Sequence, residues 1–426
     1  MRGIRAAAEA VAPLSPWVLF AAWLAVPAAA PATVAPQVQG MLRRARVAVA
    51  GDVADVTPYD HGRVAVATLH TVKTFKGEVA GDTVRVVEMR DRPSATPVFR
   101  GGAAVVVFLR PADKNSYLRQ QLPAGDYYQI VSDHSCLSAT SPAEAGETRA
   151  IVERIARMQS NPQTDPRRRA EADRALTFDL IAARDATLVQ DGALSLGEIP
   201  GLATTLQAQE RRRLETALGR DDLPPHVRVA LVKGIGAAKL AALVPVLRRM
   251  HNLPTDVQAA VWAALAQLGA PPSQEEWEHE LSNGEAGVRA AAVREYLRAT
   301  SAAGIPRAAS VALHDRDTSV RVAAIEALGE TKRSEALPTL QETFSDPSPD
   351  VYQASARAID EIGGRPAAEV LAKLAFAAPP QNQRLALTAL LLMVGHDDPL
   401  VVQIEENHPN PEMRDLIEHG LPKLEH

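Results

Sequence analysis

Two patterns of apolar and polar residues divide the chain. From about residue 46 to residue 132, apolar and polar residues alternate with a period of two, in segments rich in β-branched residues. Such alternation predicts short strands with one buried face. Beyond Arg167 no segment clearly carries this pattern, and apolar residues recur at helical spacing instead. The sequence therefore predicts a small β domain followed by an all-α region.

The β region, residues 46–140, predicts five strands. They correspond to the segments RVAVAGDVADV, GRVAVATLHTV, DTVRVVEM, AAVVVFL and YYQIV, with Gly, Asp and Pro turn signals between them. Five or six short strands most simply close into a small barrel or a curled antiparallel sheet, because closure removes exposed strand edges. Residues 141–166 predict a helix over residues 143–158, followed by a linker or capping stretch, SNPQTDP.

The α region repeats itself from about Val227. Equivalent anchor residues stand at Val227, Val257, Val288, Val320, Val351 and Gln383, so successive anchors are 30, 31, 32, 31 and 32 residues apart. Three residues after each anchor is an alanine: Ala230, Ala260, Ala291, Ala323, Ala354 and Ala386. Eight residues after each anchor is a large apolar residue: Ile235, Leu265, Tyr296, Leu328, Ile359 and Leu391. A regular period of this length indicates a repeat architecture.

These columns have a physical interpretation. The small residue lets neighbouring helices approach closely, and the large residue fills the core between repeats. A second helix, as in EALPTLQETF, completes each unit, and we expect the second helices to line a concave surface. Acidic residues before most anchors predict helix N-caps: Asp221, Asp256, Asp315, Asp317, Asp346 and Asp350. We therefore predict an α-solenoid over residues 227–420, after a less regular helical start over residues 167–226.

The repeated units resemble HEAT repeats, most closely the short HEAT-like type of bilin lyase subunits (PBS-lyase-like HEAT repeats). The resemblance is carried by DRDTSVRVAAIEALGETKRSEALPTL and DPSPDVYQASARAIDEIGG, and it covers residues 227–420. It implies the fold and little about function, because such arrays serve many unrelated roles. It also implies a ladder between repeats, formed by an arginine after the anchor: Arg228, Arg289, Arg321 and Arg384, with interruptions at Gln258 and Tyr352.

Two segments of the β region carry a second resemblance. TVKTFKGEVAGDTVRVV and FRGGAAVVVFLR resemble bacterial relatives of the netrin and tissue-inhibitor-of-metalloproteinases module, which is similar to an OB fold. In that family, inhibition depends on a cysteine at the mature N-terminus whose amine and carbonyl chelate the protease zinc. This chain has no cysteine before Cys136. The resemblance therefore implies an OB-like fold without the inhibitory chemistry.

The first residues predict an export signal. A basic start precedes an apolar segment over residues 17–26, and small residues follow up to Ala32. This order is typical of a secretory signal peptide, and cleavage after Ala32 fits the small-x-small rule. The alternative is an uncleaved anchor, but the apolar run is shorter than the ~20 residues that span a bilayer. We expect a signal peptide over residues 1–32, a linker over residues 33–45, and a periplasmic or secreted protein without stable membrane insertion after cleavage.

Charge and cysteine content limit the classes of partner and cofactor. The chain has 46 basic and 51 acidic residues, and the resulting charge of -5 creates no field that would attract nucleic acid or an anionic membrane. Aromatic residues make up only 4%, whereas alanine is abundant, which suits closely packed helices. Cys136 is the single cysteine, so it cannot form an internal disulfide or supply a typical structural zinc site. We expect no cofactor.

Glu278, His279 and Glu280 form the most suggestive cluster for metal chemistry, because di-iron hydroxylases built from HEAT-like repeats use His-Glu pairs from several repeats. His279 lies 22 residues after its anchor, and the equivalent residues of the other units are Arg249, Ser310, Glu342, Lys373 and Glu405. A metal site needs several ligands that converge on one point. This column is polar but chemically mixed, so it predicts an exposed ridge without a metal.

Three other features receive a structural interpretation. Residues 133–136, DHSC, place nucleophile and base types side by side, but adjacent residues seldom face each other, so we expect a polar loop with one buried thiol. Residues 234–236, GIG, resemble part of a phosphate loop, but no strand precedes them, and a turn between two helices accounts for them. The arginine runs 167–169 and 211–213 have acidic neighbours and predict solvated helix surface. We expect no catalytic residues.

We therefore expect an exported, non-enzymatic scaffold or adaptor that binds a partner protein through the solenoid. Contact is expected at the polar ridge formed by Arg249, His279, Ser310, Glu342, Lys373 and Glu405. One alternative is a regulator or inhibitor of extracellular proteases that acts through the β module. The other is a HEAT-repeat enzyme of the lyase type, although such lyases act in the cytoplasm and the predicted export argues against them.

Overall fold

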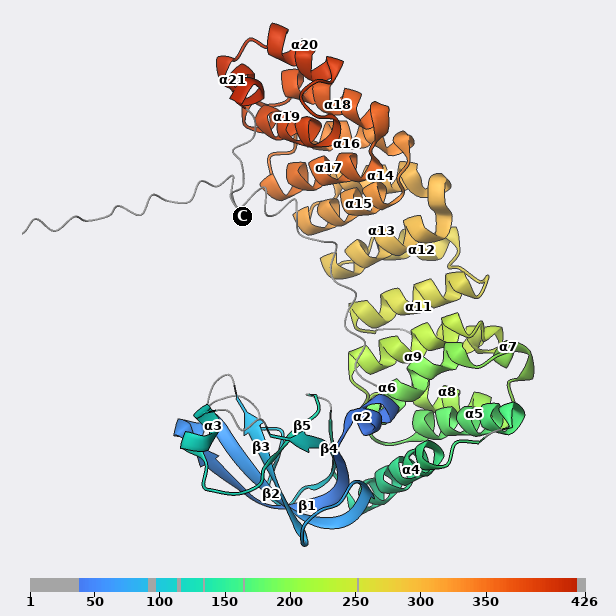
Figure 1. Cartoon of the computed structure of the whole chain (residues 1–426). Coiled ribbons are helices and arrows are strands. Elements are labelled where there is room, and N and C mark those ends of the chain that lie inside the picture. The colour runs from blue at the N-terminus through green and yellow to red at the C-terminus, as the bar shows by residue number, and fades with distance from the viewer. Residues whose placement is uncertain are drawn as a thin grey trace, which may run out of the picture. The chain divides into compact units, whose positions relative to one another are not determined.

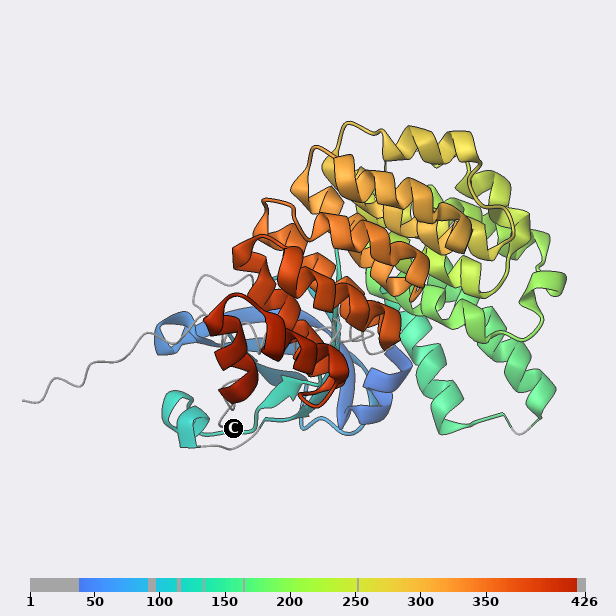
Figure 2. The same cartoon turned by 90° about the horizontal axis from the view of Figure 1, so that it is seen from above.

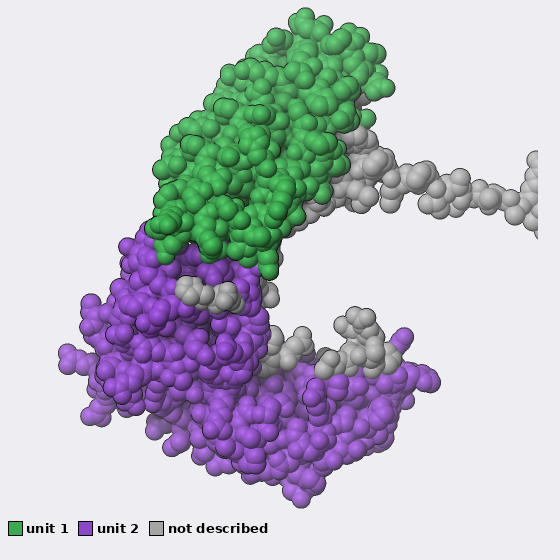
Figure 3. Space-filling view, turned by 180° about the vertical axis from the view of Figure 1, so that it is seen from behind, with its two compact units in different colours: residues 1–33, 273–426 green, residues 34–272 purple. Residues whose placement is uncertain are grey.

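The computed structural model describes residues 38–90, 97–112, 116–132, 135–163, 165–250 and 253–419. The described residues form two compact units, one up to residue 272 and one from residue 273 (Figure 3). The predicted signal peptide, residues 1–32, lies outside the described residues.

Strands β1 to β5 close into a small barrel (Figure 1). The strands are β1 (Val47–Tyr59), β2 (Val64–Lys76), β3 (Thr83–Met89), β4 (Ala104–Pro111), β5 (Tyr128–Ile130) and β6 (Cys136–Ala139). They follow the order β1-β2-β3-β5-β4, and β4 pairs back with β1. The expected barrel is confirmed, with two differences from the predicted antiparallel five-stranded sheet. Strands β3 and β5 run parallel, and β6 pairs with the first residues of β4, whose last residues pair with β5.

The barrel shares a core with the first helices of the chain. Helix α2 (Val38–Arg44) precedes β1, α3 (Ser116–Gln121) separates β4 from β5, and α4 (Pro142–Ser160) follows β6. Met41 of α2, Phe108 of β4 and Ile155 of α4 belong to one buried apolar cluster. The linker expected over residues 33–45 therefore contains a helix, because buried apolar residues recur there at helical spacing.

The rest of the first unit is helical. Its further helices are α5 (Pro166–Ala182), α6 (Ala186–Ser195), α7 (Leu202–Thr205), α8 (Ala208–Leu218), α9 (Pro225–Ala237), α10 (Val244–Leu247) and α11 (Thr255–Gln267). Short 3₁₀ helices lie at Asp60–Gly62, Leu196–Glu198 and Ala241–Leu243. Helices α6, α9 and α11 pack successively in one layer, drawn in green to yellow in Figure 1.

Two glycines lie inside α9 and allow its neighbours to approach. A Cβ added to Gly234 would collide with the carbonyl oxygen of Ala193 in α6, and one added to Gly236 would lie 2.5 Å from the amide oxygen of Gln267 in α11. The expectation that a turn accounts for residues 234–236 is therefore wrong. These glycines are helical, and they let α9 pack closely on both sides.

The second unit is a stack of helical hairpins. Its helices are α12 (Gln274–Leu281), α13 (Ala286–Thr300), α14 (Ile305–His314), α15 (Thr318–Glu330), α16 (Leu337–Thr343), α17 (Pro349–Ile362), α18 (Gly364–Ala377), α19 (Pro380–Val394), α20 (Pro399–Asn407) and α21 (Pro411–His419). Short 3₁₀ helices at Ser301–Gly304 and Ser334–Ala336 lead into α14 and α16. Every described element after β6 is helical, as predicted. Within the described part of the chain, no helix combines the length and apolar character needed to cross a bilayer.

Helices α12 to α20 form two layers (Figures 1 and 2). Helices α13, α15, α17 and α19 carry the anchors and form the anchor layer. Helices α12, α14, α16, α18 and α20 form the second layer. The large apolar residue of every repeat is buried, and the alanine is buried in every repeat except at the half-buried Ala291. The predicted apolar spine is therefore confirmed.

The anchor layer is the more closely packed of the two. A Cβ added to Gly329 of α15 would lie 2.8 Å from the Cα of Ala358 in α17, so these two helices approach almost backbone to backbone. Helices α14, α16 and α18 make fewer close contacts with one another. Because a stack bends toward the layer whose helices lie closer together, the anchor layer forms the inner side of the bend within this unit. The expectation that the second helices line a concave surface is wrong here.

Ion pairs connect successive repeats. Arg289 of α13 donates hydrogen bonds to both carboxylate oxygens of Asp315 at 2.9 and 2.8 Å. Arg321 of α15 donates to Asp346 at 3.1 and 3.3 Å. The ladder implied by the resemblance is therefore present at these two positions. Asp315 and Asp346 are ladder partners and not the expected N-caps, whereas Asp317 caps α15 with its side chain.

Candidate partner-binding ridge

All six residues of the predicted polar column are exposed. Five of them lie on successive helices of the second layer: His279 on α12, Ser310 on α14, Glu342 on α16, Lys373 on α18 and Glu405 on α20. We call these five residues the ridge. The sixth residue, Arg249, follows α10 in the other unit. The ridge therefore presents one polar side chain per repeat along one layer.

Helical periodicity turns the ridge residues outward. On α18, Leu371 and Leu374 are buried, and Lys373 between them is exposed. On α20, Ile404 is buried and the adjacent Glu405 is exposed. Residues three or four apart share a helix face, whereas adjacent residues point about 100° apart. The burial of the apolar face therefore fixes the outward direction of each ridge side chain.

Ion pairs link neighbouring helices beside the ridge. Glu278 of α12 accepts hydrogen bonds from the guanidinium of Arg307 in α14 at 2.7 to 3.0 Å, and these hold the pKa of Glu278 below its usual value. Arg365 of α18 donates to the Asp398 carboxylate before α20 at 3.0 and 2.9 Å. Partly exposed pairs of this kind contribute about 1 kcal/mol or less each, so they orient the surface and add little to the stability of the stack.

Two exposed apolar side chains flank one end of the ridge. Phe376 is 37% exposed and lies three residues after Lys373 on α18, and Val402 is 38% exposed and lies three residues before Glu405 on α20. Each apolar residue therefore shares a helix face with its ridge residue. Protein interfaces favour aromatic side chains among polar groups. Neither residue is one of the positions 22 residues after an anchor, so the repeat register did not predict them. A search of the sequence for apolar residues three positions from each ridge residue could have found both.

The Glu278, His279 and Glu280 cluster does not converge on one point. The three residues are adjacent on α12, so their side chains point in different directions, and Glu278 is bound to Arg307. Across the residues that the structure describes, no three His, Cys, Asp or Glu side chains are placed to hold a metal ion together.

Cys136 lies in strand β6, which corrects the expectation of a polar loop at this residue. Burial, followed by the charges of Asp185 and Glu88, raises the pKa of its thiol to about 12. Because the thiolate is the reactive form of cysteine, this thiol is a poor nucleophile at neutral pH. The neighbouring residues 133–134 of the DHSC segment lie outside the described residues.

Comparison with known proteins identifies the helical hairpins. Residues 305–391, from α14 into α19, match the family model of HEAT repeats. Among solved structures, human deoxyhypusine hydroxylase in complex with glycerol is similar at 19% identity and a TM-score of 0.25, over 59% of this chain and 99% of that chain. An engineered protein is similar at 17% identity and a TM-score of 0.28, over 66% of this chain and 90% of that chain. No curated protein matches the sequence.

The comparison with deoxyhypusine hydroxylase corrects one expectation. Deoxyhypusine hydroxylase is an enzyme, so this match contradicts the expectation that the chain has no enzymatic activity. At a TM-score of 0.25 the likeness assigns no reaction, substrate or site to this chain.

Proposed function

Because the chain is a HEAT-repeat protein with a small β domain at its N-terminal side, we propose that it is an exported scaffold that binds a partner protein through the ridge. HEAT repeats suggest a protein-interaction scaffold, because a stack of hairpins offers an extended surface to a partner. One observation carries the proposal. Equivalent positions of five successive repeats are exposed and polar, beside exposed Phe376 and Val402, while the two core columns of the same repeats are buried except at the half-buried Ala291.

The ridge carries charges of both signs. Glu342 and Glu405 are acidic, and Lys373 lies between them along the layer. A partner that fits this order presents a basic group opposite each glutamate and an acidic group opposite the lysine, since complementary charges set orientation and exclude wrong partners. The aromatic ring of Phe376 then supplies apolar contact area next to Lys373.

Exchanging two ridge charges is expected to weaken partner binding without unfolding the protein. The double variant Glu342→Lys/Lys373→Glu keeps the net charge and reverses the order of charges along the ridge. Neither side chain has a hydrogen bond or ion pair with another described residue, so the melting temperature should stay unchanged. We expect capture of the partner from the native host to fall at least about tenfold, measured by co-purification. Arg249→Glu tests separately whether the binding surface includes the other unit.

The matched control is Glu361→Lys/Arg414→Glu. Both residues are exposed, on α17 and α21, and this exchange also keeps the net charge. The proposal requires that the control retain the partner. Undiminished capture by the ridge variant, or an equal loss in both variants, would show that the ridge is not the binding surface.

Export is the second part of the proposal and has its own test. The basic start, the apolar residues 17–26 and the small residues up to Ala32 support a signal peptide. Cleavage after Ala32 would leave Thr33 as the first residue. N-terminal sequencing of the protein recovered from the periplasm or medium of its native host is expected to begin at Thr33. Recovery of only the uncut chain from the cytoplasm would contradict export.

A further inference from the structure

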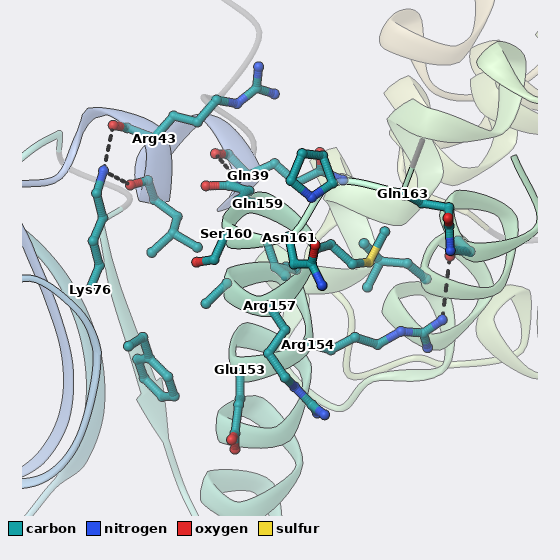
Figure 4. A pocket seen from close by; sticks show the side chains of 18 of the residues that line it. Gln39, Arg43, Lys76, Glu153, Arg154, Arg157, Gln159, Ser160, Asn161 and Gln163 are labelled. Carbon is teal, nitrogen blue, oxygen red and sulfur yellow. Dashed lines mark hydrogen bonds between the residues drawn. The ribbon is translucent and has the colours of Figure 1, made fainter. Parts of the chain in front are cut away.

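A pocket lies beside the barrel, within the unit that ends at residue 272. It has a volume of about 1120 Å³ and is lined by residues of α2, the end of β2, the last turns of α4 and the first half of α5 (Figure 4). Residues 73–76 of β2 form one wall, and residues 153–160 of α4 form the opposite wall. The pocket is open to solvent along one side, so it suits an extended ligand better than a small enclosed one.

Basic residues outnumber acidic residues in the lining of this pocket. The basic residues are Arg43, Lys73, Lys76, Arg154, Arg157 and Arg169, and the acidic residues are Glu153 and Asp173. The whole chain has a formal charge of -5, so the positive lining is a local feature of an acidic protein. A local positive patch favours a ligand that carries negative charge.

Three of the basic side chains are already engaged. The ammonium group of Lys76 donates to the carbonyl oxygens of Leu42 and Arg43 at 2.9 and 2.8 Å. Lys73 pairs with Glu153 at 3.3 Å, and Arg154 is bound to a carboxylate of α5. These contacts hold the walls of the pocket in place.

The other three basic side chains are available to a ligand. Arg43, Arg157 and Arg169 are exposed and come from α2, α4 and α5. Their guanidinium groups have no hydrogen bond or ion pair with any residue in the described ranges. In Figure 4, the side chains of Arg43 and Arg157 extend toward opposite ends of the pocket. They therefore match charges that are spaced along an elongated ligand.

The surface between these arginines contributes apolar and backbone groups. Phe75 of β2 and Met158 of α4 line the pocket and are only partly buried. The pairing of β3 with β2 ends at His70, and the following residues of β2 up to Lys76 pair with β1 among the described strands. A strand with a free edge can add an extended segment through its backbone groups.

We propose that this pocket binds an extended acidic segment of a partner protein. Carboxylates of the segment pair with Arg43, Arg157 and Arg169, because a guanidinium binds a carboxylate through two parallel hydrogen bonds. Apolar side chains of the segment lie over Phe75 and Met158. The site shares no residue with the ridge and does not depend on it.

The lining favours a peptide over a nucleic acid. Single-stranded nucleic acids bind on several aromatic side chains, and Phe75 is the one aromatic residue among the described residues that line the pocket.

The test uses the purified full chain and a fluorescein-labelled peptide of twelve residues, with six glutamates spaced by serine, glycine and leucine. Binding is followed by fluorescence anisotropy at low and high salt. We expect saturable binding that weakens as salt rises, and at least about tenfold weaker binding of the peptide with glutamine in place of glutamate. The triple variant Arg43→Ala/Arg157→Ala/Arg169→Ala should also lose at least about tenfold in affinity.

The matched control removes three exposed arginines from the same unit, in Arg63→Ala/Arg100→Ala/Arg212→Ala. It should bind the peptide as the parent chain does, and both variants should keep the parent melting temperature. Competition with a twelve-nucleotide thymidylate strand and with phosphatidylglycerol vesicles identifies other anions that bind. The proposal is overturned by absence of peptide binding, by equal losses in the two triple variants, or by tighter binding of the nucleic acid or the vesicles. The ridge variant Glu342→Lys/Lys373→Glu should leave peptide binding unchanged, which separates this site from the proposed scaffold function.

Discussion

Asp315→Ala is expected to destabilise the second unit by about 3–5 kcal/mol, because it leaves a buried guanidinium without its carboxylate. The Arg289 and Asp315 side chains are only 5% and 9% exposed. Arg289 also donates to the carbonyl oxygen of Asn283 at 2.8 Å, so it is held by the turn before α13 as well as by the carboxylate that follows α14. Urea denaturation followed by circular dichroism would measure the change in the free energy of unfolding.

An exposed pair in the same two repeats provides the control for this prediction. Arg294 of α13 and Glu326 of α15 are 3.0 Å apart, and each is 39% exposed. Glu326→Ala should cost less than about 1 kcal/mol, since water replaces the lost partner. Replacing both buried partners, in Arg289→Leu/Asp315→Leu, should cost less than Asp315→Ala alone. Similar losses for Asp315→Ala and Glu326→Ala would contradict the importance of burial.

The contribution of Asp315 should also depend on pH. Burial raises the pKa of this carboxyl, but the hydrogen bonds from Arg289, the hydrogen bond from the backbone N–H of Asp317 and the nearby positive charges together outweigh burial and hold the pKa below its usual value. A carboxyl whose pKa is lowered by folding stabilises the native state above its unfolded pKa of about 4, and this stabilisation is lost as pH falls through the folded pKa. The stability difference between the parent chain and Asp315→Ala should therefore be constant near neutral pH and shrink below about pH 4.

Gly329→Ala is expected to destabilise the stack by about 1–3 kcal/mol, although alanine is the better helix former. The new methyl would lie 2.8 Å from the Cα and 2.9 Å from the Cβ of Ala358, so α15 and α17 would have to separate. The same substitution at Gly146 of α4 meets no atom within 4 Å and should stabilise the protein by up to about 1 kcal/mol. Thermal denaturation of the two variants should therefore give shifts of opposite sign. An upward shift for Gly329→Ala would show that the two helices are not in close contact.

The repeat stack could be predicted from the sequence because its register is regular. The columns that contain Ala323 and Leu328 are three and eight residues from their anchors, and these distances place both on the buried side of a helix. Strand β6 and helix α2 were missed, since each element is too short for its apolar pattern to stand out in the sequence. Tertiary contacts decide their structure.

The relation between the two helical layers could not be predicted from single repeats. Which layer packs more closely depends on contacts between repeats, such as Gly329 against Ala358, and no single-repeat pattern contains this information. The exposure of the ridge follows from helical periodicity, but its apolar neighbours Phe376 and Val402 required the structure. The same holds for the pocket, whose free arginines at 43, 157 and 169 come together only through the packing of α2 and α5 against α4.

Site-specific photo-crosslinking in the native host tests the proposed partner binding most directly. A photoreactive residue is placed on the ridge at Glu342 or Lys373, or away from it at Glu361 or Arg414. The account predicts one discrete protein adduct from both ridge positions and none from the two other positions. No adduct from the ridge, or the same adducts from all four positions, would contradict a partner held by the second layer of the stack.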